Sequence, residues 1–295
     1  MSATPSYLRP IVAVIIGIAL FSTMDAVMKS ASLAIGAFSA YFLRCIVGFC
    51  IIAPVWWLRT RAMPSRAVMR IHIKRSVVVA FMGLSFFYAI VRLPLAEAIA
   101  ISFIAPLIAL FLAAVLLGEK IELRSIVAGV AGLAGVLLIV GGKVGSEEMT
   151  DEVVWGLAAV VFSAVLYAWN LILQREQALV AKPTEVSTFQ NGIVALVLLG
   201  ATPFLLEWPN MQVWGELVLG ALLAISAAVM LTWAYARAEA QVLVPFEYTG
   251  FLWAVLLGWL MFGEDVTGWT ISGASLIILA CLIASRRKRP EQSAL

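Results

Sequence analysis

The chain has 295 residues, of which 63% are apolar and only 13% are charged. Its mean hydropathy of +1.03 excludes a soluble globular protein and indicates an integral membrane protein. The formal net charge of +3 is not the signature of a nucleic-acid-binding surface, and no nucleic-acid partner is expected.

Ten apolar stretches, each long enough to cross a bilayer, fill almost the whole chain. Six of them carry no charged residue, namely residues 98–117, 125–142, 153–174, 186–206, 217–236 and 266–285. Of the other four, residues 77–91 also carry no charge, whereas residues 10–31, 36–58 and 241–262 are interrupted by one or two charges each. About 20 helical residues span the hydrocarbon core, and lipid offers no partner to an open strand. The sequence therefore predicts an all-α membrane protein with ten transmembrane helices.

The spans form two sets of five, and the last two spans of each set are joined by a Gly-Glu turn, Gly118–Glu119 and Gly263–Glu264. An offset of 145 residues also pairs Arg92 with Arg237, whereas an offset of 141 fits the first span of each set better. Because five is odd, the second set enters the membrane in the opposite orientation, as in the inverted repeats of secondary transporters. We expect repeats at 1–144 and 145–295, the second ending in a short basic cytoplasmic tail, and we expect the turns to cap helix ends.

The basic residues predict the orientation. With the amino terminus in the cytoplasm, sixteen Lys and Arg residues lie inside and three lie outside, namely Lys29, Arg92 and Lys143. This division predicts a multi-pass protein of the cytoplasmic membrane with both termini cytoplasmic. The basic connection 59–75, with the chain's single histidine, His72, is expected either to lie on anionic headgroups or simply to fix the topology.

The stretch AIAISFIAPL at 98–107, continued through LLGE at 116–119 to Gly129 and Gly135, resembles the EamA-like domain of the drug/metabolite transporter superfamily. The second half is a poorer copy, which keeps Gly263–Glu264 and Gly273 but has Phe251 in place of Pro106. Arg44 also resembles an arginine of that family's first repeat.

The resemblance implies ten helices and alternating access around a central cavity, lined mainly by helices 1, 3, 4, 6, 8 and 9. Members of the superfamily export amino acids, take up cofactors such as riboflavin or S-adenosylmethionine, or move other metabolites. The motifs therefore leave the substrate open.

Ionisable residues inside spans are costly and are functional candidates by default. They are Asp25, Lys29, Arg44, Glu97 and Glu247. Asp25 and Lys29 are four residues apart, so each is expected to neutralise the other. Glu247 follows Pro245 and is expected either to bind a substrate ammonium or a coupling proton, or to lie in cytoplasmic water at a helix mouth.

Aromatic and small polar residues on the inner helices complete the candidate site, since flat rings stack on an amphipathic substrate and polar groups hydrogen-bond it. The predicted substrate-binding residues are Tyr88, Ser102, Phe103, Trp169, Asn170, Trp233, Glu247 and Tyr248. For each ring, packing or lipid contact is the alternative.

Nothing in the chain predicts an enzyme, a metal site or a cofactor. It has no HExxH, no P-loop and no cysteine-histidine cluster, and Cys45, Cys50 and Cys281 all lie in spans. A channel is a weaker hypothesis because the intramembrane charges form no ring, and a membrane scaffold would have no use for an inverted repeat.

The leading prediction is a secondary transporter that exports amino acids or related amphipathic metabolites. The number of inner aromatic residues makes the chain similar to the aromatic amino acid exporters of the superfamily. The runner-up is an uptake carrier for a larger cofactor or a nucleoside-like metabolite. Its partners are the lipid bilayer and the small-molecule substrate.

Overall fold

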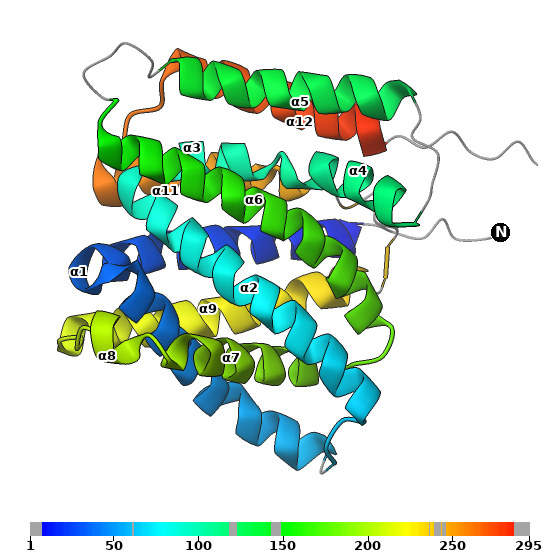
Figure 1. Ribbon diagram of the computed structural model, residues 1–295, viewed down its shortest axis with the longest axis vertical. Coiled ribbons are helices and arrows are strands. Elements are labelled where there is room, and N and C mark those ends of the chain that lie inside the picture. The colour runs from blue at the N-terminus through cyan, green and yellow to red at the C-terminus, as the bar shows by residue number, and fades with distance from the viewer. Residues whose placement is uncertain are drawn as a thin grey trace, which may run out of the picture.

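The computed structural model describes residues 8–60, 62–117, 123–142, 149–235, 237–238, 243 and 246–285. Within these ranges the regular elements are all helices. Most of them run roughly parallel across the view in Figure 1, with the N-terminus on the right. We call the end at which the first helix begins the Arg9 end, and the opposite end, which carries Glu264, the Glu264 end.

The ten predicted spans each contribute a helix, which confirms the all-α prediction. The helices are α1 (Leu8–Thr60), α2 (Arg66–Arg92), α3 (Leu95–Ser102), α4 (Ala105–Leu117), α5 (Leu123–Gly141), α6 (Asp151–Ala178), α7 (Pro183–Leu199), α8 (Thr202–Leu205), α9 (Met211–Tyr235), α11 (Thr249–Phe262) and α12 (Gly268–Ser285).

Two predicted spans lie in α1, on either side of a kink. Ile35 has φ −129° and ψ 17°, and Gly36 has φ 75° and ψ 150°, so neither residue is helical. Glycine adopts a positive φ at little steric cost because it has no Cβ. The chain turns back here toward the Arg9 end, as Figure 1 shows.

Two other spans are each divided in the structure, and a proline accounts for both breaks. A proline ring clashes with the carbonyl four residues earlier and lacks the N–H that continues a helix. For Pro106 that carbonyl belongs to Ser102, where α3 ends, and for Pro203 it belongs to Leu199, where α7 ends. The first break places Phe103 between α3 and α4.

By length and composition, α1, α2, α6 and α9 each contain a candidate membrane span. The apolar segments Leu95–Ala109, Ile126–Gly141, Thr249–Phe262 and Gly268–Ile283 are shorter. Large apolar side chains point outward along these helices, such as Leu133, Leu137 and Leu252, each more than half exposed. An outer surface of this kind suits a bilayer rather than water.

The prediction that residues 59–75 form a basic connection between helices is wrong for residues 66–75. Residues 66–75 form the start of α2, which is capped by the Ser65 hydroxyl accepting from the Val68 N–H at 3.4 Å. His72 is fully buried and Arg75 is 8% exposed, so neither faces headgroups. A count of charges could not separate them from the exposed Arg70 on the same helix.

The helices pack in pairs: α1 lies against α9, α2 against α6, and α5 against α12. A close backbone approach joins Gly135 of α5 to Gly273 of α12. A Cβ on Gly135 would lie 2.7 Å from the Gly273 carbonyl oxygen, so only glycine permits this crossing. Small residues at helix crossings are typical of membrane bundles.

Candidate functional site

Arg75 lies inside the bundle, where its guanidinium binds three neutral amides. Its Nε donates to Asn170 Oδ1 at 2.9 Å, its Nη2 donates to Gln174 Oε1 at 3.4 Å, and its Nη1 donates to Gln177 Oε1. The three amides share one face of α6. Among the described residues no carboxylate forms an ion pair with Arg75. Its hydrogen bonds are largely satisfied while its positive charge is not neutralised.

The same network continues through His72 toward α7. Gln177 Nε2 lies 2.7 Å from His72 Nδ1, and His72 Nε2 lies 3.0 Å from Glu185 Oε1. The imidazole stacks on Phe189 with ring centroids 4.9 Å apart. The network fixes α2, α6 and α7 to one another and so holds Arg75 in place.

Arg44, on the second half of α1, is a second interior cation. Its Nε is buried and has no hydrogen-bond partner, and its Nη2 lies 3.6 Å from the Cys45 sulfur, a weak acceptor. The guanidinium carbon lies 5.3 Å from the centroid of the Tyr41 ring, whose hydroxyl donates to the Val79 carbonyl at 2.9 Å. The Nε–H of Arg44 is therefore an unused donor.

The predicted pairing of Asp25 with Lys29 is wrong. Lys29 instead forms an ion pair with Glu264, which is far away in the sequence. Asp25 is half-buried and interacts electrostatically with Arg44, but it forms no ion pair within the described part of the chain. Local spacing on a helix favours a pair only when no distant carboxylate competes, and here Glu264 does.

Glu247 lies just before α11 and is an interior carboxylate. The hydroxyl of Tyr235, on α9, donates a hydrogen bond to its Oε1. Glu247 is half-buried, and none of the described cations forms an ion pair with it. Asp25, Arg44, Arg75 and Glu247 thus form an interior charge set of two acidic and two basic groups, with no ion pair among its members.

Tyr167 connects three members of the interior charge set. The Tyr167 hydroxyl interacts electrostatically with Glu247, Arg75 and Asp25. It also interacts with the hydroxyls of Tyr235 and Tyr248. Tyr167 lies three residues before Asn170, which holds Arg75. Residues from α1, α2, α6, α9 and the start of α11 therefore surround one region. Tyr167 and Tyr235 were not among the predicted substrate-binding residues, although both lie on helices that were predicted to line the cavity.

Phe103 and Tyr248 pack edge to face, with ring centroids 5.1 Å apart. The Cys281 thiol donates to the Phe103 carbonyl at 3.2 Å. The Ser102 hydroxyl instead bonds its own helix at the Ala98 carbonyl, 2.8 Å away. Of the predicted residues, the structure brings Asn170, Glu247 and Tyr248 near Tyr167, and Phe103 joins them through Tyr248.

Tyr88 and Trp233 lie at opposite ends of the bundle, each beneath an arginine four residues later. The guanidinium carbon of Arg92 is 3.5 Å from the Tyr88 ring centroid, and that of Arg237 is 4.3 Å from the Trp233 centroid. Each arginine also donates to the backbone carbonyl of its aromatic residue, at 3.2 Å and 3.0 Å. The structure does not bring these two rings to the interior charge set.

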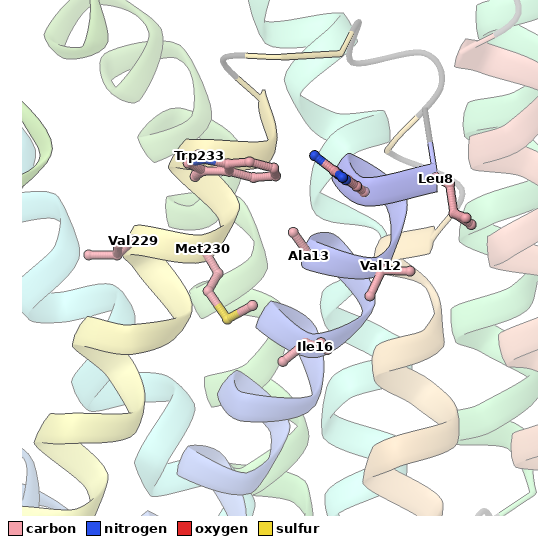
Figure 2. Close-up of a pocket in the computed structure, with 8 residues that line it drawn as sticks. Leu8, Val12, Ala13, Ile16, Val229, Met230 and Trp233 are labelled. Atoms are coloured by element: carbon pink, nitrogen blue, oxygen red, sulfur yellow. The ribbon is translucent and has the colours of Figure 1, made fainter. Parts of the chain in front are cut away.

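Two of the predicted aromatics face outward. Trp169 is 49% exposed on α6, and Trp233 is 39% exposed on α9. Trp233 borders an apolar groove of about 570 Å³ between α1 and α9, which Figure 2 shows. The groove is also lined by Leu8, Arg9, Val12, Ala13, Ile16, Val229 and Met230. It lies at the Arg9 end, away from the Glu264 end where Tyr88 meets Arg92.

The two Gly-Glu turns can be compared only in part. Gly118–Glu119 lies outside the described residues, as does Pro245. Gly263 has φ 63° and ends α11 in the left-handed conformation, so the predicted cap is confirmed for this turn. No group of three or more potential metal ligands occurs among the residues that the structure describes.

Comparisons with known proteins point to one family. The model of the EamA-like transporter family matches residues 8–141 and again residues 154–286. A pseudopaline exporter of Pseudomonas aeruginosa is 27% identical over 275 residues, which cover 91% of this chain and 93% of that protein. A riboflavin transporter of Rhizobium johnstonii is 28% identical over 74% of this chain and 70% of its own. A solved crystal structure, 19% identical, superposes with a TM-score of 0.64 over 93% of this chain and 96% of its own, which shows a common fold.

Proposed function

Because the chain belongs to the EamA-like transporter family, we propose that this multi-pass membrane protein exports small zwitterionic metabolites, such as amino acids, by alternating access. Transport is the family's function, whereas the substrate class and the direction are our proposal. The relative named as a pseudopaline exporter supports export, since it matches nearly the full length of both chains.

The observation that carries the substrate class is the interior charge set. Each of its four members is held without an oppositely charged partner at ion-pair distance among the described residues. An unpaired charge inside a membrane protein is costly and marks a substrate or ion pathway. A zwitterion reduces this cost, because its carboxylate binds Arg44 or Arg75 while its ammonium binds Asp25 or Glu247. An uncharged molecule leaves all four groups unpaired.

Aromatic rings beside these charges favour a substrate with an apolar or aromatic side chain. Tyr167, Tyr235, Tyr248 and Phe103 surround the same region as the charge set. Rings of this kind stack on flat side chains, and their hydroxyls bind polar groups. Aromatic amino acids combine both requirements and remain our first candidates.

The packing supports two inverted repeats at 1–144 and 145–295. Contact of α1 with α9 joins the first span of one repeat to the third span of the other, and contact of α2 with α6 is its counterpart after exchange of the repeats. Arg92 over Tyr88 and Arg237 over Trp233 are the same device at an offset of 145 residues, placed at opposite ends. Opposite placement of equivalent pairs is what an inverted repeat requires.

The distribution of Lys and Arg supports an inner-membrane protein whose Arg9 end, with both termini, lies in the cytoplasm. The Glu264 end is then the outer end. A reporter that is active only outside the cytoplasm should be active at Asn210 and inactive at Met63. The reverse pattern would reject this orientation.

The second candidate is uptake of a cofactor, since relatives in Rhizobium johnstonii and Brucella anthropi are named as riboflavin transporters. The two candidates differ in what a purified, reconstituted carrier exchanges. We propose to load proteoliposomes with unlabelled amino acids, pseudopaline or riboflavin and to measure entry of the labelled compound. Saturable exchange of zwitterions without exchange of riboflavin is expected, and the opposite result would reject the proposal.

An arginine variant links that result to the site. Arg75→Gln removes the buried charge, and we expect the apparent affinity for zwitterions to fall by about tenfold or more, because hydrogen bonds to charged groups contribute about 1.5–3 kcal/mol. Arg70→Gln is the matched control, since Arg70 is exposed on the same helix. Equal loss in both variants would separate transport from the interior charge set.

A further inference from the structure

One carboxylate, that of Glu264, connects three segments at the outer end. Its Oε1 pairs with Lys29 Nζ of α1, and its Oε2 accepts from the Leu95 N–H of α3 at 2.7 Å. Lys29 Nζ also donates to the Leu93 carbonyl at 2.7 Å. The side chains of Lys29 and Glu264 are 5% and 15% exposed. Glu264 belongs to the second repeat and its partners belong to the first.

Glycines hold this carboxylate in position. Gly263 ends α11 with its N–H bonded to the Trp259 carbonyl at 3.0 Å, and the Glu264 N–H follows to the Gly258 carbonyl at 3.1 Å. A Cβ on Gly258 would lie 2.7 Å from Glu264 Oε2, so any larger residue would displace the carboxylate. The end of α11 is therefore shaped around Glu264.

Glu264 also caps a helix of the other repeat. Pro94, at the N-cap position of α3, provides no side-chain hydrogen bond to the helix. The first N–H groups of a helix lack partners within it and attract negative charge. Glu264 supplies that charge at Leu95, which is the first residue of α3.

Two residues further along α3 lies a second buried carboxylate, Glu97. It accepts from the Thr270 hydroxyl of α12 at 3.2 Å, and it interacts electrostatically with Lys29. Thr270, like Glu264, belongs to the second repeat. Moving the two repeats apart at this end would break the bonds of Glu264 and Thr270 together.

We propose that Lys29 and Glu264 are the outer gate of the carrier, and that Lys29 exchanges Glu264 for Glu97 when the gate opens. This inference rests on the proposed alternating-access function. Separation of a buried ion pair leaves two uncompensated charges, which is strongly unfavourable in a membrane protein. Glu97, which already interacts electrostatically with Lys29 in the closed state, then becomes the partner of Lys29 within the first repeat. Lys29 is then neutralised in both states, and the gate opens without a bare ammonium.

A nearby pair provides a matched control. Arg92 and Glu152 also join the two repeats at this end, but Glu152 is 69% exposed. Ion pairs in water contribute little to holding two elements together. Arg92→Gln should therefore leave the gate closed, whereas a change at Lys29 or Glu264 should open it.

The test measures access from outside to Cys281, which contacts Phe103 in the interior and is 3% exposed. The substitutions Cys45→Ala and Cys50→Ser leave Cys281 as the single cysteine. Intact cells are treated with a membrane-impermeant thiol reagent for different times. The protein is then purified, and the rate at which Cys281 is labelled is determined for the monodisperse fraction. Lys29→Gln and Glu264→Gln should each raise the rate by about tenfold, as expected if a lost pair shifts the closed–open equilibrium by at least 1.4 kcal/mol. Arg92→Gln should change it by less than about twofold.

Glu97→Gln distinguishes a gate from a structural contact. Without Glu97, Lys29 has no second carboxylate to neutralise it, so opening becomes less favourable and the labelling rate should fall below that of the parent. A structural role predicts that all three variants loosen the outer end alike. Labelling at the parent rate in Lys29→Gln, or faster labelling in Glu97→Gln, would overturn the proposal. The assay requires no known substrate, so its failure is distinct from failure of the proposed zwitterion specificity.

Discussion

The two repeats differ at one pair of equivalent positions in the kind of group that each binds. An offset of 141 residues, which pairs Phe21–Ser22 with Phe162–Ser163, also pairs Lys29 with Asn170. Lys29 binds the Glu264 carboxylate of the other repeat, whereas Asn170 accepts from the Arg75 guanidinium of the other repeat. At this position the first repeat has a cation of its own, Lys29, whereas the second repeat has a neutral residue that binds a cation of the first repeat. Repeats that share helix order and turns can therefore place opposite charge requirements at equivalent positions.

This difference predicts which exchanges between the repeats the protein tolerates. Asn170→Lys copies the residue of the first repeat into the second and places an ammonium against Arg75. Two buried like charges without a carboxylate should lower the free energy of unfolding by about 3–5 kcal/mol, the largest effect that we expect. Thermal unfolding of the purified protein in detergent measures it.

Asn170→Asp is the control of opposite sign. It supplies the carboxylate that Arg75 lacks, so stability should be retained while zwitterion transport falls, because the guanidinium is already neutralised. If Asn170→Lys were as stable as the parent, Arg75 would not carry a buried charge in this arrangement.

The reverse exchange, Lys29→Asn, should have the next largest effect. It leaves Glu264 without its cation, and we expect a loss of about 3 kcal/mol, at the lower limit for a buried pair because Glu264 is partly exposed. Adding Glu264→Gln removes the unpaired carboxylate and should recover part of that loss. A double-mutant cycle of unfolding free energies measures the coupling, and strictly additive losses would contradict a direct ion pair.

The sequence predicted the ten helices because long apolar runs leave few alternatives in lipid. It also predicted the Gly263 cap, since Gly followed by a polar residue after an apolar helix is a local signal. The partner of Lys29 could not be predicted, because Glu264 is 235 residues away and the nearby Asp25 offered a plausible local pair. Arg75 was counted among loop residues, since burial of an arginine depends on amides of α6 that only the tertiary structure brings close.

The aromatic residues show the same limit. Helical position placed Tyr88, Trp169 and Trp233 on inner helices, yet the direction in which each ring points depends on the packed neighbours. Asn170, Glu247 and Tyr248 lie near Tyr167, and whether all the predicted residues bind substrate stays a prediction. The exposed Trp169 and the interior Tyr167, two residues apart on α6, allow a direct test.

Tyr167→Phe should weaken binding of a zwitterion by about three- to tenfold, since it removes one hydroxyl close to the interior charges and leaves the ring in place. Trp169→Ala should change the apparent affinity by less than about twofold, because a ring that is 49% exposed on the outer face of α6 stacks on no substrate. Competition of unlabelled substrates in proteoliposomes gives both values. A several-fold loss in Trp169→Ala that is confined to aromatic substrates would instead place Trp169 in the binding site.

The smallest effects are expected at an arginine–aromatic contact that both repeats contain. Arg92 and Arg237 each stack on the aromatic residue four positions earlier. Arg237 is exposed, and the Arg92 side chain is 21% exposed. Exposed cation–π contacts contribute about 0.5–1 kcal/mol, so Arg92→Gln and Arg237→Gln should each lower stability by no more than about that amount. Arg92 also pairs with Glu152, but that carboxylate is mostly in solvent and adds little.

Near-equal small losses in thermal unfolding would indicate that the two pairs are equivalent contacts at the two membrane faces. A loss in Arg237→Gln that is much larger than in Arg92→Gln would show instead that the Arg9 end relies on Arg237 for a contact without a counterpart in the first repeat.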